Sequence, residues 1–301
     1  MKYIYKNATY PCNRDLLIQI DNAARSLAEK FAQLDLAGLQ ISEYNQRYLG
    51  NKLRNIRGTL QLYNFLLSLI LSGSKKPLKE FTFIEYGGGS GVFSLLAKQM
   101  GIGRVIYNDI YDVSGEDVKK LSTSLDLKID DIVVGDLGDL ISHINKNNYH
   151  IDAIGSYDVI EHIYDIENYL RNLSHLSKNP FRIVFGSGAN IKNPRTRRSL
   201  QKEQIRIEHQ SREKVWGHKD RDTLKSYLDA RKEIISSYAA NISSNTVSQL
   251  AVATRGLVKQ DIEKCVDEYR STGAISYKPD HPTNTCDPYT GNWAEHLMDT
   301  N

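Results

Sequence analysis

The sequence predicts an α/β protein built on a doubly wound, mostly parallel sheet. Between residues 80 and 188, short runs rich in β-branched and aromatic residues alternate with helical stretches. The run at 81–86 is followed by a glycine turn, GGGSG, and then by an amphipathic stretch at 92–100. Strands that alternate with helices form parallel βαβ units, and their ligands bind beyond the carboxyl ends of the strands.

Five runs are expected to form the strands of this sheet. They are residues 81–86, 104–108, 131–135, 151–157 and 181–186. Sheets of this kind often end in an antiparallel hairpin, and we expect AISYK at 274–278 and NWAEHLM at 292–298 to supply it. The prediction is therefore a mostly parallel sheet with an antiparallel edge strand.

The rest of the chain divides into regions around this core. Residues 1–76 form an N-terminal helical cap, because apolar residues recur there at helical spacing up to the linker SGSKKP. Residues 77–190 form the core, and residues 191–272, after the fifth strand, form a charged helical insertion that serves as a lid or substrate region. Residues 273–301 return to complete the sheet.

Composition narrows the class of protein. The chain has 301 residues, of which 40% are hydrophobic, so it can bury a sizeable core. Its net charge of +3 gives no argument for nucleic acid, and no nucleic-acid partner is expected. The three cysteines form no C-x-x-C pair, which fits a reducing compartment. Without a signal-peptide core or an apolar run long enough to span a bilayer, we expect a cytoplasmic protein with no membrane partner.

The glycine turn permits several interpretations. A P-loop would end in Gly-Lys-Ser/Thr, but no lysine occurs between the glycine turn and Lys98, so this interpretation is rejected. A dinucleotide fingerprint would need glycine where Val92 stands, or would start at Gly89 and end at Ser94, so an NAD-dependent enzyme remains a minor option. A bare structural turn between strand and helix is the simplest alternative.

A third interpretation depends on the acid before the turn. Glu85 stands two residues before Gly87, in the pattern acid-x-G-x-G. A glutamate at this position can accept hydrogen bonds from an ammonium group, whereas it would repel a pyrophosphate. The turn therefore favours a zwitterionic, sulfonium-bearing ligand.

Acids also follow the next strands. Asp109 follows the second run, where a carboxylate can accept from both hydroxyls of a ribose. Asp136 follows the third run, where it can accept from an adenine amino group while Leu137 packs on the ring. Each acid alone could cap a helix, but acids at successive strand ends after an acid-bearing glycine turn are harder to explain as caps.

This series resembles the class I S-adenosylmethionine-dependent methyltransferases, whose fold is Rossmann-like. The match covers about residues 81–188, roughly a third of the chain, and the order of elements agrees. The resemblance implies that three groups of residues hold S-adenosylmethionine. These are Glu85, Gly87 and Gly89 for the methionine part, Asp109 for the ribose, and Asp136 with Leu137 for the adenine. Tyr157, at the end of the fourth strand, would lie near the methyl group.

The segment DVIEHI, residues 158–163, resembles the corresponding segment of ubiquinone-type O-methyltransferases and of small-RNA 2′-O-methyltransferases. Asp158, Glu161 and His162 have i, i+3, i+4 spacing and would share one face of a helix. His162 is the first candidate for a general base, with His218 second. Alternatively, the three residues bind a divalent metal, which is possible but not expected, or His162 packs structurally. Further candidates for substrate contact are His281, Asn284, Asp287 and Trp293.

These patterns predict an S-adenosylmethionine-dependent methyltransferase. Its acceptor atom would be an oxygen, less favourably a nitrogen, of a small molecule or of a sugar in a biosynthetic pathway. One alternative is an RNA 2′-O-methyltransferase, and another is a non-catalytic module that binds a nucleotide or S-adenosylmethionine.

Overall fold

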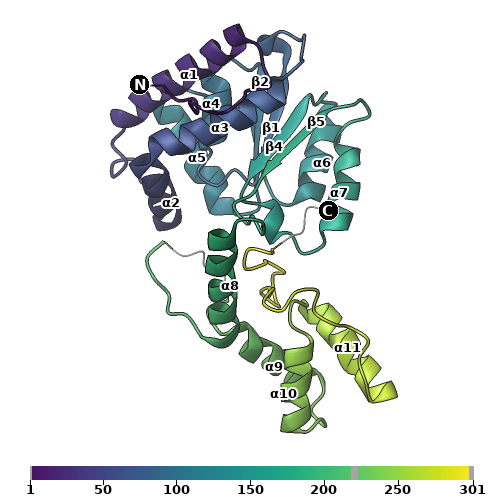
Figure 1. Cartoon of the computed structure of the whole chain (residues 1–301). Coiled ribbons are helices and arrows are strands. Elements are labelled where there is room, and N and C mark those ends of the chain that lie inside the picture. The colour runs from purple at the N-terminus through teal and green to yellow at the C-terminus, as the bar shows by residue number, and fades with distance from the viewer. Residues whose placement is uncertain (1, 218–222, 298–301) are drawn as a thin grey trace. The chain divides into compact units, whose positions relative to one another are not determined.

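The computed structural model describes residues 2–217 and 223–297, and the chain folds into two compact units (Figure 1). Unit 1 comprises Met1–Tyr157 and Glu167–Gly186, and unit 2 comprises Asp158–Ile166 and Ser187–Asn301. The segment 158–166 follows the fourth strand directly, yet it packs with the C-terminal part of the chain.

Unit 1 contains a five-stranded, all-parallel sheet in the order β3-β2-β1-β4-β5. The strands are β1 (Thr82–Tyr86), β2 (Arg104–Asp109), β3 (Asp131–Val134), β4 (Ala153–Tyr157) and β5 (Arg182–Gly186). Helices flank both faces, with α1, α3, α4 and α5 on one side and α6 and α7 on the other (Figure 1). The predicted α/β fold and all five predicted strands are confirmed.

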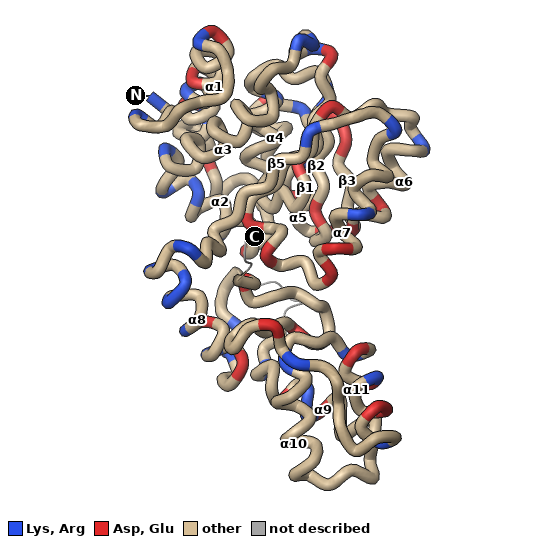
Figure 2. The backbone as a smooth tube through the Cα atoms, turned by 45° about the vertical axis from the view of Figure 1, so that its right-hand side comes forward, with Lys and Arg blue, Asp and Glu red and all other residues tan. Residues whose placement is uncertain are grey.

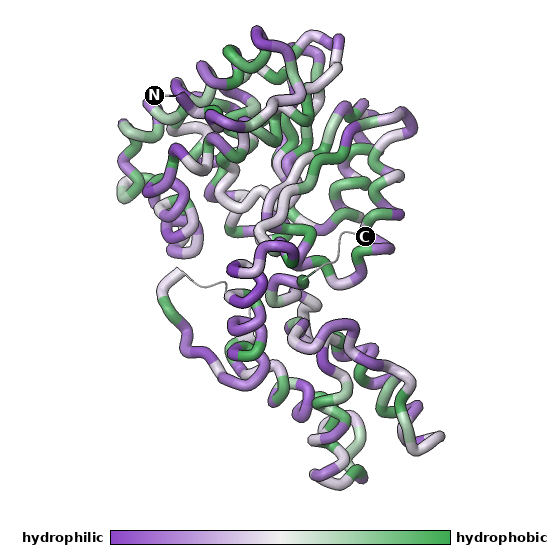
Figure 3. The backbone as a smooth tube through the Cα atoms, viewed as in Figure 1, coloured by the Kyte–Doolittle hydropathy of each residue, from purple (hydrophilic) through white to green (hydrophobic). Residues whose placement is uncertain are grey.

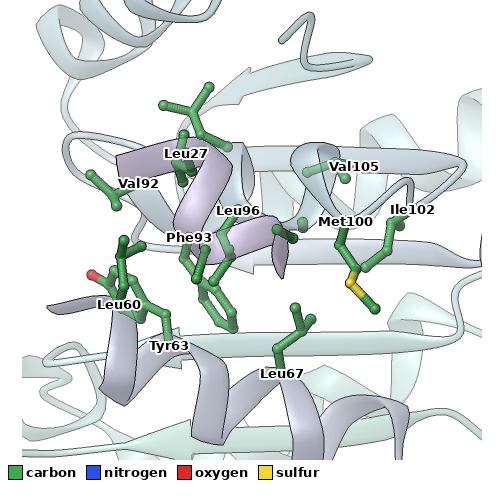
Figure 4. Packing of buried hydrophobic residues seen from close by; sticks show 14 of the residues in the cluster. Leu27, Leu60, Tyr63, Leu67, Val92, Phe93, Leu96, Met100, Ile102 and Val105 are labelled. Atoms are coloured by element: carbon green, nitrogen blue, oxygen red, sulfur yellow. The ribbon is translucent and has the colours of Figure 1, made fainter. Parts of the chain in front are cut away.

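The central strands are buried along most of their length because helices cover the sheet on both faces. In the register of the sheet, Phe83 of β1 lies opposite Val105 of β2 and Ala153 of β4, and all three are fully buried. Helix α4 (Val92–Gln99) packs between this sheet and the N-terminal helices, where the ring of Phe93 stacks on Tyr63 at 4.9 Å between centroids (Figure 4).

The N-terminal region forms three helices. They are α1 (Arg14–Ala32), α2 (Glu43–Arg54) and α3 (Ile56–Leu71). The side chain of Asn13 caps α1, and that of Ser42 caps α2. Asp117 of α5 (Asp112–Ser124) is buried and accepts hydrogen bonds from the Ser42 N–H at 3.1 Å and from Asn45 Nδ2 at 2.8 Å. These bonds fix α2 against the helix that follows β2.

Two helices and two short turns complete unit 1, and a third short turn, η2, belongs to unit 2. The helices are α6 (Leu137–Asn147) and α7 (Ile166–Leu173), and the 3₁₀ turns are η1 (Leu78–Glu80), η2 (Ile160–His162) and η3 (Ser174–Leu176).

Unit 2 contains the helices of the predicted insertion. They are α8 (Pro194–His209), α9 (Tyr227–Tyr238), α10 (Ser244–Ala253) and α11 (Lys259–Thr272). Helices α9, α10 and α11 share a small apolar core. Beside it, the fully buried guanidinium of Arg231 pairs with Glu208 of α8 and donates to the Ala251 carbonyl at 2.8 Å. A buried charge needs such partners, so this pair ties α8 to α9 and α10.

The predicted antiparallel edge strand is not confirmed. Among the described residues 273–297, the structure shows only an isolated antiparallel bridge between Cys286 and Trp293. Turn chemistry explains the difference, since Asp287 Oδ1 accepts from the N–H groups of Tyr289 and Thr290, and Glu295 has a φ of 52°. Residue 298, the last of the proposed strand, lies outside the described residues.

None of the helices in the described part of the chain combines the length and the apolar character that crossing a membrane requires.

Candidate functional site

The glycine turn after β1 has a conformation that depends on its glycines. Gly87, Gly89 and Gly91 have φ angles of 65°, 53° and 70°, in the left-handed region that other residues rarely adopt. Gly88 lies so close to Tyr107 of β2 that an added Cβ would come within 2.4 Å of its ring. The tight strand–turn–helix arrangement predicted here is present.

Glu85 closes this turn from the inside. Its side chain is 4% exposed, and Oε2 accepts a hydrogen bond from the N–H of Ser94, the third residue of α4, at 2.8 Å. Because Gly91 has no side chain to cap α4, Glu85 performs that role from the neighbouring strand. Burial raises the pKa of Glu85 to about 7. The sequence predicted a ligand contact for Glu85 and missed this cap.

Asp109, at the end of β2, is bound directly to the glycine turn. Its Oδ2 accepts from the N–H of Gly89 at 2.7 Å, and its Oδ1 accepts from the N–H of Tyr111 at 2.8 Å. The hydroxyl of Tyr107 donates to the Gly89 carbonyl at 2.6 Å, so both polar groups of Gly89 are held by β2. Each carboxylate oxygen of Asp109 has a further lone pair, which a ligand hydroxyl can use.

Asp136 lies at the end of β3 as the N-cap of α6. Its Oδ1 accepts from the N–H groups of Gly138 at 2.7 Å and Asp139 at 3.2 Å, and Asp139 accepts in return from the N–H of Asp136. This is a capping box, so the helix-cap alternative is realised at this position. Asp136 is also exposed, and Leu137 beside it is 7% exposed.

The order of the strands places the glycine turn where open α/β sheets bind their ligands. Because β1 lies between β2 and β4, the direction of winding reverses at β1 and β4, and open α/β sheets bind ligands at such a reversal. Tyr157 ends β4 at this point, with its ring edge-on to that of Tyr63 at 6.5 Å. On its other side, Gly186 of β5 lies so near that an added Cβ would meet the Tyr157 ring at 2.8 Å.

Two features of the turn suit a polar ligand. The hydroxyl of Ser90 is buried and has no hydrogen-bond partner in the described structure, although buried polar groups are normally paired. At Gly89, by contrast, an added Cβ would meet no atom within 4 Å, so space is open beside the backbone. A ligand that approaches the backbone and supplies a polar partner would satisfy both.

One cation of the N-terminal helices acts near this turn. The ammonium of Lys52 in α2 is half-buried and lies over the ring of Tyr63, 5.5 Å from its centroid. Its positive charge lowers the pKa of Glu85, although burial raises that pKa by more. Lys52 therefore contributes positive charge to the environment of Glu85.

In unit 2, the segment 158–166 does not form the predicted helix. Asp158 has a φ of 56°, and only Ile160–His162 form a single 3₁₀ turn. The expectation that Asp158, Glu161 and His162 share one α-helical face is wrong, because the left-handed residue starts a turn instead.

The two acids of this segment are held by backbone and side-chain groups that follow β5. Asp158 Oδ1 accepts from the N–H of Gly188 at 2.9 Å, and Glu161 Oε1 accepts from the hydroxyl of Ser187 at 2.7 Å. Glu161 is 1% exposed, and its Oε2 has no hydrogen-bond partner in the described structure. Burial, reinforced by the charge of Glu161, raises the pKa of Asp158 to about 6.

His162 has a defined tautomer. Its Nδ1 lies 2.7 Å from the carbonyl oxygen of Trp293, which can only accept, so Nδ1 carries the proton. In the neutral ring the lone pair is then on Nε2. This is the form that a general base requires.

The C-terminal candidates for substrate contact are mostly buried. Trp293 is 7% exposed, and its ring stacks on those of Tyr164, with centroids 6.0 Å apart, and His296, with centroids 4.3 Å apart. Asn284 and Asp287 are 1% and 2% exposed and bond to other residues of unit 2. No local pattern around Trp293 predicts its packing against the 158–166 segment.

The metal alternative gains no support from the structure. Across residues 2–217 and 223–297, no three or more His, Cys, Asp or Glu side chains are grouped so as to hold a metal ion. The second candidate base, His218, lies outside the described residues.

Neither a protein-family model nor a curated protein matches the sequence of this chain.

Proposed function

We propose that this protein is an S-adenosylmethionine-dependent methyltransferase that transfers a methyl group to an oxygen of a small molecule or sugar. A nitrogen acceptor is less favoured. The observation that carries the proposal is the 2.7 Å hydrogen bond from Gly89 to Asp109. It joins an acid-bearing glycine turn to the carboxylate of the next strand, at the place where the winding of the sheet reverses.

The residues around the turn fit this cofactor. Asp109 would accept from the ribose hydroxyls with the lone pairs that Gly89 and Tyr111 leave unused. Asp136 uses Oδ1 in the capping box, which leaves Oδ2 for an adenine amino group, with Leu137 against the ring.

The methionine part of the cofactor would lie along Gly87 and Gly89, where the backbone is open and the Ser90 hydroxyl needs a partner. Glu85 would act there mainly by holding α4 in place, and Tyr157 would contact the region of the methyl group. When bound, the cofactor would supply an electrophilic methyl group.

His162 is proposed as the general base. Its Nε2 would take the proton of the acceptor hydroxyl. The carbonyl of Trp293 would then stabilise the imidazolium through the Nδ1–H bond that is already formed. The rest of catalysis would be positioning and exclusion of water.

A dinucleotide cofactor is the main alternative for the same turn. The third glycine of that fingerprint serves close packing of helix and strand, and Val92 occupies its place with a fully buried side chain. This packing disfavours the alternative. A non-catalytic binding module would retain the cofactor site, and only turnover with an acceptor separates it from the enzyme.

Calorimetric titration of the whole chain with S-adenosylhomocysteine tests the proposal, with NAD as the control ligand. We expect a dissociation constant in the micromolar range, about −8 kcal/mol, for the first ligand and no binding of the second. Binding of NAD alone, or of neither ligand, would overturn the proposal.

A further inference from the structure

A row of cations runs along the exposed side of α8. Arg195, Arg198, Lys202 and Arg206 are all exposed. At 3.6 residues per turn, their positions i, i+3, i+7 and i+11 fall within about 80° of one another around the helix. We call these four residues the α8 stripe. The opposite face of α8 is buried in unit 2 through Gln204, Ile207 and Glu208.

The stripe differs from the other charged helix surfaces of unit 2. On α9 and α11, cations that are exposed or half-buried pair with acids three residues away: Lys232 with Asp229, Lys264 with Asp261, and Arg270 with Asp267. On α8, Arg206 pairs with Glu203. Within the described residues, Arg195, Arg198 and Lys202 form no ion pair, and Figure 2 shows the positive charge along this helix.

The positive charge is concentrated around this helix. Residues 192–214 contain eight Lys or Arg and three Asp or Glu, whereas the whole chain has a net charge of +3. The remainder of the chain is therefore slightly negative. The net charge of the whole chain does not reveal this local excess of positive charge. Figure 3 shows that α8 is mostly hydrophilic.

The length of the stripe indicates the kind of anion it suits. With a rise of 1.5 Å per residue, it spans about 16 Å and presents a cation roughly every 5 Å. That is too long for a single phosphate and fits a linear polyanion. Phosphates recur along a nucleic-acid strand on this scale, from about 3.4 Å of axis in a duplex to more in an extended strand. Guanidinium groups also match phosphate oxygens in geometry.

An anionic lipid surface fits α8 less well. A helix that lies in a membrane interface needs a broad exposed apolar face, but α8 exposes a single large apolar residue, Ile205 at 49%, while Ile207 is 7% exposed. We therefore propose that the α8 stripe binds the phosphodiester backbone of a nucleic acid. Trp216, which follows α8 in the chain and is 54% exposed, offers an aromatic surface on which a base can stack.

Fluorescence anisotropy of the full chain with a labelled 20-nucleotide oligouridylate tests this inference at several salt concentrations. The variant R195Q/R198Q/K202Q removes the three unpaired cations. The variant K232Q/K264Q/R270Q removes the same charge from α9 and α11 and serves as the matched control. We expect the stripe variant to lose at least about tenfold in affinity at low salt. Its slope of log affinity against log salt should fall by about 2, at about 0.7 per lost phosphate contact. The control should change both quantities little.

The remaining outcomes decide between sources of the anion. Equal binding of a single-stranded DNA of the same length supports backbone recognition, and tighter binding of RNA supports it with added 2′-hydroxyl contacts. Three results would overturn the inference: no binding of either nucleic acid, equal losses in both variants, or binding of phosphatidylserine vesicles without nucleic acid. The assay contains no cofactor, so a failed methyltransferase proposal would leave its result interpretable.

Discussion

The Nδ1 atom of His162 donates a hydrogen bond to the carbonyl oxygen of Trp293, 131 residues later in the sequence. The N–H of Trp293 bonds in return to the carbonyl of His162 at 3.3 Å, so the two residues are joined twice. The carbonyl fixes which ring nitrogen carries the proton, and it leaves the other with a lone pair.

This relationship predicts the state of His162 in solution. In a two-bond ¹H–¹⁵N spectrum of histidine-labelled protein at pH 8, we expect His162 as the Nδ1–H tautomer, identified by the loss of its signals in H162Q. Most exposed neutral histidines favour the other tautomer, so His175, which is exposed, provides the comparison. A signal for His162 as the Nε2–H tautomer would contradict the assignment. Once an acceptor is found, H162Q should lower turnover by about 10²–10⁴-fold and change cofactor affinity little.

Replacing Asp109 should weaken the cofactor site. We expect D109A to lower the affinity for S-adenosylhomocysteine by about 1–3 kcal/mol, because it loses the carboxylate and releases the N–H of Gly89. Calorimetry measures the change, and thermal unfolding reports whether the fold survives. D131A is the matched control, since Asp131 pairs with Arg104 at the start of β3. Equal affinity of D109A and the wild type would remove Asp109 from the site.

The buried Glu85 predicts a pH dependence of stability. Its folded pKa of about 7 lies above the ordinary value of 4.5, so between these values the folded protein binds the proton more tightly than the unfolded chain. This contribution to stability is present below about pH 4.5 and is lost as the pH rises through about 7. E85Q keeps an oxygen for the Ser94 N–H and has no charge to bury. Relative to wild type, it should gain about 1–3 kcal/mol of unfolding free energy from pH 5 to pH 8, measured by urea denaturation. A difference that does not vary with pH would contradict the raised pKa.

Replacing Ser90 tests whether its hydroxyl serves a ligand or the fold. Its buried hydroxyl has no hydrogen-bond partner in the described structure, so S90A should leave the unfolding free energy unchanged within about 0.5 kcal/mol or raise it. The same variant should bind S-adenosylhomocysteine several-fold more weakly if the hydroxyl serves the ligand. S122A is the control, since the Ser122 hydroxyl donates to the Lys119 carbonyl away from the turn. A clear loss of stability in S90A with unchanged affinity would assign Ser90 to the fold instead.

Much of unit 1 could be predicted from local pattern. The strands followed from their composition, and the proximity of Asp109 to Gly89 followed from the rule that parallel strands end at the same edge. Local pattern could not decide whether Glu85 contacts a ligand or caps a helix, because a carboxylate suits an ammonium group and a helix N-terminus equally well. Only the direction of the Glu85 side chain, which points to the Ser94 N–H, distinguishes these two roles.

The errors lie where distant parts of the chain decide the local structure. DVIEHI has helical spacing, but Gly188 and the left-handed Asp158 hold it as a turn. NWAEHLM alternates like a strand, yet the described part pairs with the 158–166 segment rather than with the sheet. The spacing of the cations in the sequence predicts a row on one side of α8, whereas the net charge of the whole chain does not reveal it.

The bonds that hold the glycine turn are all made by the protein itself. Residues 87–91, four of them glycine, have high conformational freedom in the unfolded chain. In the folded protein, hydrogen bonds with Asp109, Tyr107 and Asn108 hold them in one conformation. That conformational entropy is lost when the protein folds and not when a ligand arrives. A ligand that binds this turn would therefore meet a backbone already in its final conformation, and the free energy of its contacts would contribute to affinity without the cost of ordering the loop.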